Sequence, residues 1–379
     1  MRIVHIYKDY FPVLGGIENH MRELAEAQAR AGHDVTALVT QRRGHAPTDI
    51  NENGVRVVRV PRHFDVQSAP IALSFPKRVA ELTAGADIAH LQAPYPIGEA
   101  CNLYFGKAKR SVISWQSDIV RQKTLLKLYA PTLRRVIAKA DRIIPSSDAY
   151  AATSPWLRDQ VRKCTVVPIG IDAGRFARTM QSHHRATRLR NSWLSSLPSS
   201  EESLVLLSVG RFRYYKGLDD LIRALTLMPN AVAVLAGNGA MEAEWKALAQ
   251  RLDVAKRVFF VGSPNDADLP AYYQAADAYV LPANARAEAY GIAVLEAMAS
   301  GLPVITTEVG TATSWINQDS VTGYVVPPLQ PPAIADAAGK LADRSVREHM
   351  GGAARQRVID EFTREKMVAR IDDVYRSLL

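Results

Sequence analysis

Two glutamates, Glu288 and Glu296, are separated by seven residues in the stretch EAYGIAVLEAMASG, and the stretch contains no Lys or Arg. Helix-surface carboxylates often pair with a base three or four positions away, so these two acids need another explanation. The apolar spacing predicts a helix from about residue 292, which places Glu288 before the helix and Glu296 inside it. The free N–H groups at the helix start, from Ala289 to Gly291, would favour an anion or a polar ligand. A plain stabilising acid at a helix start stays open as an alternative for Glu288.

These residues need a scaffold, and the first half of the chain predicts a parallel sheet. Short apolar runs alternate with helical patterns, which is typical of a doubly wound α/β domain. The pair Gly15-Gly16 precedes a helical pattern that ends near Gly32. We expect strands at residues 2–7, 34–40, 55–60, 87–92, 111–115, 141–147 and 163–168.

The second half predicts another domain of the same kind. The polar, Arg- and Ser-rich residues 172–203 predict an irregular linker with a disordered part. The alternation then restarts, and each half has its ligand edge at the carboxyl ends of its strands. The apolar face of the last helix, 362–379, indicates that this helix docks on the protein. We expect strands at 204–210, 231–237, 257–262 and 303–309, and helical pattern at 239–254 and 268–283.

Composition indicates a globular protein, and the positive charge is concentrated in one part of the chain. The chain has 379 residues, enough for two domains, and 47% hydrophobic residues. No signal peptide or membrane span is expected, and Cys101 and Cys164 predict neither disulfides nor a metal cluster. The net charge is +9, and residues 107–139 hold nine Lys or Arg against one acid, Asp118. Helices that are basic on one side suit an anionic membrane surface, and a solvated basic face is the alternative.

Four stretches resemble motifs of the retaining glycosyltransferases of family 4, and they follow one another along the chain in the family's order. EAYGIAVLEAMASGLPVI resembles the family's E-x7-E signature, and SVGRFRYYKGLDDLI (208–222) resembles its strand–loop–helix with Arg211 and Lys216. YFPVLGGIENHMRELA (10–25) resembles its Gly-Gly loop, and VVPIGIDAGRF (166–176) its connection between domains. The resemblance implies an α/β GT-B architecture, with two Rossmann-like domains facing each other across a cleft. We expect an acceptor domain at 1–170, onto which helix 362–379 docks back, and a nucleotide-sugar domain at 171–361.

The resemblance also implies roles for individual residues. Arg211 and Lys216 would stabilise the departing diphosphate without a metal or other cofactor, with a structural salt bridge as the alternative. Glu288 would hold donor-sugar hydroxyls and Glu296 the ribose, which would explain why both acids lack basic partners. Neither acid need be a nucleophile, and front-face substitution is expected. The catalytic residues expected are Arg211, Lys216 and Glu288. The nucleotide-sugar-binding residues expected are Gly15, Gly16, Gln116, Gly210, Gly237, Gly239, Val261, Gly262, Ser263, Ala289, Tyr290, Gly291, Ile292, Leu295 and Glu296.

One position departs from the family pattern. Many relatives carry a histidine after the fourth or fifth strand of the first domain, and Gln116 stands there in SVISWQSDIVRQK. A glutamine side chain can hydrogen-bond a sugar hydroxyl, but it cannot carry a proton or a charge. A mechanism that needs an imidazole at this point is therefore in doubt, and sugar recognition could differ.

One segment of the chain also suggests which donor and acceptor the enzyme uses. The segment WQSDIVRQKTLLKLYAPTLRRVIAKADRII looks like bacterial mannosyltransferases of O-antigen and exopolysaccharide synthesis. That favours GDP-mannose as donor and a lipid-linked oligosaccharide as acceptor, with a cytoplasmic enzyme held at the inner membrane face by its basic window. Glucosyl, galactosyl or GlcNAc transfer from a UDP-sugar is an alternative, as is a phosphorylase or a nucleotide-sugar epimerase. The non-enzymatic alternative is a basic protein that binds membrane or nucleic acid.

Overall fold

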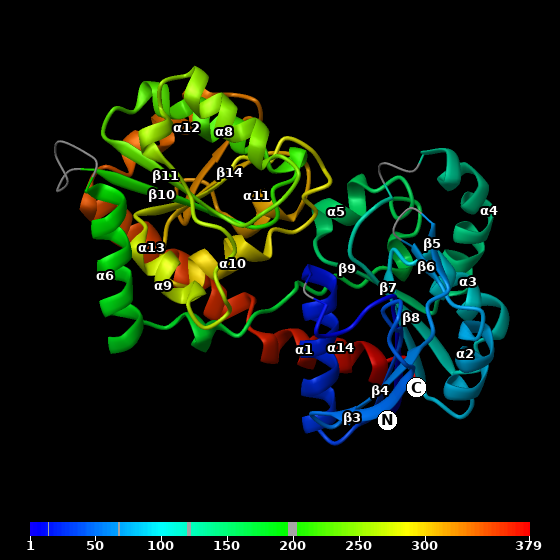
Figure 1. The fold of residues 1–379 in the computed structure, drawn as a ribbon. Helices are drawn as coiled ribbons and strands as arrows, with labels where there is room; N and C mark the ends of the chain where they lie inside the picture. Colours follow the sequence, from blue (N-terminus) through cyan, green and yellow to red (C-terminus); the bar gives the residue numbers. More distant parts are fainter. Residues whose placement is uncertain (14, 67–68, 120–122, 196–202) are drawn as a thin grey trace. The chain divides into compact units, whose positions relative to one another are not determined.

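The computed structural model describes residues 1–13, 15–66, 69–119, 123–195 and 203–379 (Figure 1). The chain divides into two compact units. Unit 1 contains Met1–Gly170 together with Arg364–Leu379, and unit 2 contains Ile171–Thr363. No helix in these described ranges has the length and hydropathy of a membrane-crossing span.

Unit 1 is built on a seven-stranded sheet in the order β3-β4-β2-β1-β7-β8-β9. All neighbouring pairs are parallel except β3 with β4. Helices cover both faces, so the central strands read as continuous apolar runs. The strands are β1 (Arg2–Ile6), β2 (Asp34–Thr40), β3 (Thr48–Glu52), β4 (Val55–Val60), β7 (Ile88–Ala93), β8 (Arg110–Trp115) and β9 (Arg142–Pro145), with a separate hairpin of β5 (Phe64–Val66) and β6 (Ala69–Ile71). The helices are α1 (Gly16–Arg30), α2 (Phe75–Thr83), α3 (Pro96–Phe105), α4 (Lys123–Lys139), α5 (Asp148–Thr153), η1 (Val161–Lys163) and α14 (Arg364–Arg376).

The C-terminal helix α14 packs beside α1 in unit 1 (Figure 1). Its Asp372 carboxylate accepts hydrogen bonds from Gln28 Nε2 at 3.2 Å and His33 Nε2 at 3.2 Å. Its Tyr375 hydroxyl lies 2.5 Å from Nδ1 of His90, which is fully buried. These polar contacts satisfy groups that burial would otherwise leave unpaired, so α14 is fixed in register on unit 1.

Unit 2 contains a six-stranded, fully parallel sheet in the order β12-β11-β10-β13-β14-β15. Its core contains aliphatic side chains from all six strands and from the helices packed against them, together with Phe212 and Trp245. The strands are β10 (Leu204–Val209), β11 (Ala231–Ala236), β12 (Val258–Phe260), β13 (Ala278–Leu281), β14 (Val304–Thr307) and β15 (Gly323–Val326). The helices are η2 (Ala173–Phe176), α6 (Met180–Leu194), η3 (Tyr214–Lys216), α7 (Leu218–Ala224), η4 (Leu225–Leu227), α8 (Glu242–Arg251), η5 (Ala255–Arg257), α9 (Leu269–Ala275), α10 (Ile292–Ala299), α11 (Ala312–Ile316), α12 (Pro331–Lys340) and α13 (Arg344–Glu361).

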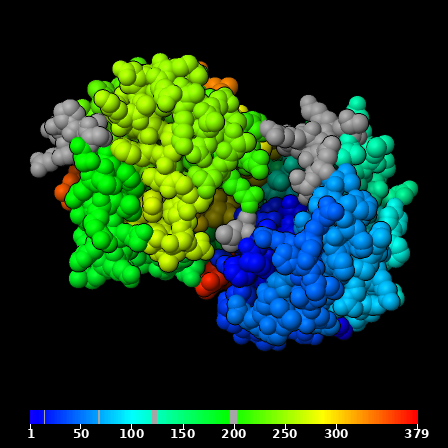
Figure 2. All heavy atoms as spheres, viewed as in Figure 1, coloured from blue at the N-terminus to red at the C-terminus, as the bar shows by residue number. Residues whose placement is uncertain are grey.

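The prediction of an irregular linker over residues 172–203 is wrong for residues 180–194. Residues 180–194 form α6, which begins with a capping box between Thr179 and Ser182. The helix packs against α9 on the surface of unit 2 (Figure 2). The helix is mostly polar and buries only a few side chains, among them Trp193. Its apolar residues are therefore too few to show a helical pattern in the sequence. Residues 196–202 of the predicted linker lie outside the described residues.

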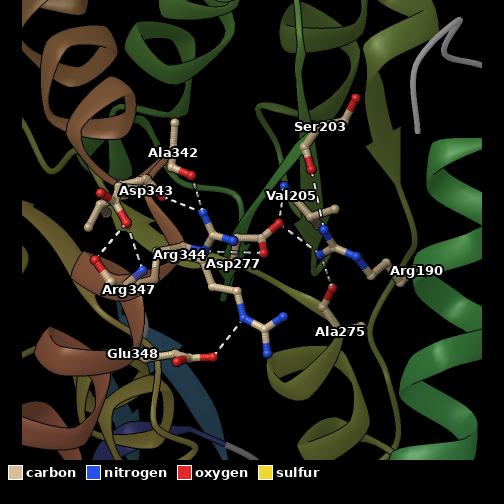
Figure 3. Close-up of polar contacts among 12 residues, drawn as sticks. Arg190, Ser203, Val205, Ala275, Asp277, Ala342, Asp343, Arg344, Arg347 and Glu348 are labelled. Atoms are coloured by element: carbon tan, nitrogen blue, oxygen red, sulfur yellow. Dashed lines mark hydrogen bonds and ion pairs between the residues drawn. The ribbon is translucent and has the colours of Figure 1, made fainter. Parts of the chain in front are cut away.

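An aspartate whose side chain is 11% exposed attaches α6 to the sheet (Figure 3). Oδ2 of Asp277 lies 2.7 Å from Arg190 Nη1 and accepts the backbone N–H of Val205 at 2.8 Å. Arg190 also donates to the backbone oxygens of Ala275 and Ser203, and Arg347 of α13 lies 3.6 Å from the other Asp277 oxygen. One carboxylate therefore joins α6, the start of β10 and α13.

Two other element predictions are corrected. Residues 163–168 are not a strand of the sheet, although an isolated bridge joins Cys164 to Ile143. The backbone N–H groups of Thr165 and Val167 also donate to the β9 oxygens of Ile143 at 2.9 Å and Pro145 at 3.2 Å. Helical pattern was expected across 268–283, but α9 ends at Ala275 and Ala278–Leu281 forms β13 beside β10. A four-residue buried strand carries too little periodicity to be separated from an adjoining helix.

Candidate active site

The chemistry-bearing residues of unit 2 follow the carboxyl ends of its neighbouring strands. Arg211 and Lys216 lie in the loop after β10, and Glu288 lies in the loop after β13. Asn284 connects these two loops, because its backbone N–H donates to Tyr215 O at 3.0 Å and its side chain to Tyr214 O at 3.2 Å. In a parallel sheet, loops at this edge are where ligands bind.

Lys216 and Glu288 form a close ion pair, which corrects the expectation that Glu288 lacks a basic partner. Lys216 Nζ lies 2.7 Å from Glu288 Oε2, and the two side chains are only 13% and 9% exposed. The sequence hid this contact because the partners lie on different strand-end loops, which meet only when β10 and β13 pair. Water is largely excluded from the pair, so its charges interact more strongly than a surface pair would.

Arg211 is more exposed than Lys216, but both side chains contribute positive charge near Tyr215. Burial and the charge of Glu288 raise the pKa of Tyr215, and the positive charges of Lys216, Arg213 and Arg211 oppose that shift. The structure therefore gathers three basic side chains and one acid around the loop after β10. Such a cluster can stabilise negative charge that develops on a bound group.

Glu296 has a hydrogen-bond partner that the sequence did not predict. It lies on α10, and its Oε2 accepts a hydrogen bond from the Tyr273 hydroxyl at 2.6 Å. Tyr273, on α9, is fully buried, and burial together with the charge of Glu296 raises its pKa well above the ordinary value. The hydroxyl therefore stays protonated and holds one carboxylate oxygen of Glu296.

The entrance to α10 has the predicted form. Gly291 adopts φ 82° immediately before the helix, which begins at Ile292. The side chains of Ala289 and Tyr290 are nearly buried, Ile292 is half-buried, and Leu295 is fully buried in the unit 2 core. Because its side chain is inaccessible, Leu295 could contact a ligand only through its backbone.

The glycines after β10 and β11 serve contacts inside the protein. Gly237 has φ 146°, and a Cβ added there would lie 1.9 Å from Gly210 O. A Cβ at Gly239 would lie 2.4 Å from the backbone oxygen of Phe212. Close backbone packing between the two loops thus accounts for both glycines. Their expected place among the nucleotide-sugar-binding residues stays a prediction.

Val261, Gly262 and Ser263 follow β12 at the same sheet edge. Gly262 O accepts the backbone N–H of Gly237 at 2.7 Å, and Ser263 Oγ accepts a bond from Asn238 Nδ2 at 3.0 Å. The loops after β12, β11 and β10 are therefore held side by side. Their role in nucleotide binding stays a prediction.

The remaining candidates, Gly15, Gly16 and Gln116, belong to unit 1. Gly15 precedes α1 as its N-cap, and Gly15 O accepts the N–H of Asn19 at 2.9 Å. Gln116 follows β8, is nearly buried, and donates from Nε2 to Gln92 Oε1 at 3.1 Å. Gln116 is thus held by an amide partner, and contact with a sugar stays a prediction for it and for the two glycines.

Comparisons with known proteins agree with this architecture. Residues 14–175 match the model of Glycosyltransferase Family 4, and residues 190–357 match that of Glycosyl transferases group 1. The chain is 33% identical to the O-antigen chain mannosyltransferase C of Escherichia coli, with 100% of this chain and 99% of the relative covered. It is 36% identical to the D-rhamnosyltransferase WbpZ of Pseudomonas aeruginosa, with coverage of 96% and 92%.

The fold is shared with solved structures at lower identity. The structure of sucrose-phosphate synthase from Thermosynechococcus elongatus superposes with a TM-score of 0.79 at 22% identity, with 100% of this chain and 98% of that chain covered. The two units thus have the Rossmann-like α/β form of GT-B glycosyltransferases. The matched family models and the full-length relatives together show that this chain is an enzyme of glycosyltransferase family 4.

Proposed function

We propose that the enzyme transfers mannose from GDP-mannose to the growing glycan of a lipid-linked oligosaccharide, with retention at the anomeric carbon and without a bound metal. The observation that carries this proposal is the Lys216–Glu288 pair at the strand-end edge of unit 2. The mannosyl assignment is supported by the full-length relative named as an O-antigen chain mannosyltransferase.

The pair suits the charge changes of glycosyl transfer. As the bond between sugar and diphosphate breaks, negative charge grows on the diphosphate, and Lys216 with Arg211 supplies fixed positive charge nearby. The Glu288 carboxylate can accept hydrogen bonds from sugar hydroxyls while its other oxygen stays with Lys216. Glu296, whose Oε2 accepts a hydrogen bond from Tyr273, is the acid that would accept hydrogen bonds from the ribose hydroxyls. The incoming hydroxyl would attack the same face from which the diphosphate leaves.

A donor panel tests the proposal. Purified enzyme is incubated with GDP-mannose, GDP-D-rhamnose, UDP-glucose, UDP-galactose and UDP-GlcNAc, and nucleotide release is measured with and without a chelator. Release from GDP-mannose that survives chelation, with an α-linked product by NMR from the α-linked donor, is the expected result. Activity that disappears with chelator and returns with manganese, or a product of inverted configuration, would overturn the mechanism.

D-Rhamnosyl transfer is the second candidate, because the rhamnosyltransferase relative is the more identical of the two, at 36%. D-Rhamnose is 6-deoxymannose, so the two donors differ by one hydroxyl. A site that hydrogen-bonds this hydroxyl would reject the deoxy sugar by about 10⁴-fold or more, whereas an apolar contact would discriminate far less. The ratio of kcat/KM values for GDP-mannose and GDP-D-rhamnose decides between the two.

We also propose that the enzyme lies peripherally on the anionic inner face of the plasma membrane. The exposed Lys127, Arg134 and Arg135 of α4 support this placement, while Arg121 and the side chain of Lys123 lie outside the described residues. Each basic group near an anionic surface contributes about 1 kcal/mol, and salt screens the attraction. Replacing the three residues by alanine should reduce flotation with anionic liposomes at low salt, and equal flotation would refute the placement.

A further inference from the structure

We propose that unit 1 contains a binding pocket for the hydrocarbon chain of the acceptor, a lipid whose glycan is attached through a phosphate or diphosphate. This inference rests on the proposed function and names the part of the acceptor that unit 1 holds. The pocket has a volume of about 500 Å³, which is within the range of small-ligand sites. It lies between the first two turns of α4 and the hairpin β5–β6.

The position of the pocket is that of a ligand site in a parallel sheet. Lys8 follows β1, Ile97 lies just after β7, and Ile119 lies after β8, and all three line the cavity. Their strands are neighbours in the sheet, so their carboxyl ends meet at one edge. That edge is where α/β sheets bind ligands.

The chemistry of the wall favours a hydrocarbon over a sugar. Val66, Ile71, Leu125 and Leu128 contribute aliphatic surface, and Leu128 is 76% exposed to water. A carbohydrate would need several free donors and acceptors. The tyrosine hydroxyls of the wall are already used inside the protein, since Tyr95 donates to the Pro70 oxygen at 3.0 Å and Tyr129 to the buried Glu99.

Charge complementarity identifies the other end of the ligand. Among the described residues that line the pocket, Lys8 carries the charge, and no described acidic side chain forms an ion pair with it. Its ammonium lies 5.7 Å from the centre of the Tyr7 ring, which leaves its N–H groups available to an anion. An apolar cavity with one cation fits an amphiphile that has a phosphate beside its chain. A concave site of about 500 Å³ suits an inserted chain better than it suits a flat bilayer surface.

The test uses farnesyl diphosphate and farnesol as soluble probes, with saturating GDP or UDP present to occupy the donor site. Binding is measured by calorimetry for the wild type, Leu128→Glu, Lys8→Ala and the control Leu73→Glu. Leu73 is 70% exposed, similar to Leu128, but it does not line the pocket. Both leucines are solvent-facing, so these variants should fold normally, and thermal unfolding checks that they do.

Leu128→Glu is expected to weaken both probes about tenfold, because it replaces apolar contact by a carboxylate. Lys8→Ala should weaken farnesyl diphosphate and leave farnesol unchanged, and Leu73→Glu should change neither. Equal binding in Leu128→Glu and wild type would overturn the pocket, as would inorganic pyrophosphate binding as tightly as farnesyl diphosphate. Leucine-dependent binding to phospholipid vesicles without binding of either probe would also overturn it, in favour of bilayer docking.

The donor panel keeps this test separate from the proposed function. If GDP-mannose is consumed but neither probe binds, the pocket assignment fails while the proposed function stands. If no nucleotide sugar is consumed, the proposed function fails whatever the probes do.

Discussion

Removing the Lys216 ammonium while keeping the bulk of the side chain separates a catalytic role from a structural one. Lys216→Met leaves Glu288 as a nearly buried carboxylate without the cation that lies 2.7 Å away in the native enzyme. Breaking a buried pair from one side typically costs 3–5 kcal/mol, and we expect about 3 kcal/mol here because both side chains keep some contact with water. For a domain of the size of unit 2, Ile171–Thr363, that loss corresponds to a fall in Tm of about 6–12 °C.

The double variant Lys216→Met/Glu288→Gln removes both charges, so no ion is left buried alone. We expect its Tm to return to within about 3 °C of the wild type, which corresponds to about 1 kcal/mol. Turnover should behave differently. Lys216→Met should lower kcat by about 10²–10³, the usual effect of losing one charge-stabilising donor. The double variant should stay at least as slow, because the diphosphate still lacks its cation.

The assay pairs thermal unfolding with nucleotide release from the best donor of the panel, measured well below the Tm of the weakest variant. Recovery of both stability and turnover in the double variant would refute the reasoning, because the pair would then be a structural salt bridge. Arg211→Gln is the companion variant. It removes an exposed cation of the same cluster, so it should lower kcat by about 10²-fold or more with little change in Tm.

Three further outcomes are expected. Tyr273→Phe removes the 2.6 Å bond that orients Glu296, so the KM for the donor should rise about tenfold while kcat changes little, and an unchanged KM in steady-state kinetics would contradict this role. Burial lowers the pKa of His5 and of His20 from 6.5 to about 4, so the unfolded chain binds more protons than the folded one below about pH 6.5. Unfolding free energy should therefore decrease as pH falls from 6.5 towards 4, by about 2 kcal/mol per histidine at pH 5, and a flat denaturant-unfolding profile would exclude it. Asp277→Ala leaves its two arginine partners without a carboxylate, so unfolding free energy should fall by about 3 kcal/mol, and a loss below about 1 kcal/mol in urea would show that the α6 attachment is weak.

Local pattern was enough to predict the helix that carries Glu296 and the central strands. Parallel strands covered on both faces read as uninterrupted apolar runs, as in β10 and β11, and α10 shows its buried stripe and its glycine entrance in the sequence. Local pattern does not predict an element that buries few side chains. Helix α6 buries few side chains, and its attachment through Asp277 depends on residues far apart in the chain.

The sequence by itself determined the class of enzyme, because the motifs around Arg211, Lys216, Glu288 and Glu296 are local and occur in the family's order. Only the tertiary structure decided which of these groups meet. Lys216 reaches Glu288 because β10 and β13 are neighbours in the sheet, although 68 residues lie between the ends of these strands, from Val209 to Ala278. Tyr273 reaches Glu296 because α9 and α10 fold against the same sheet. Side-chain contacts over such separations are set by strand order and packing, which no single segment encodes.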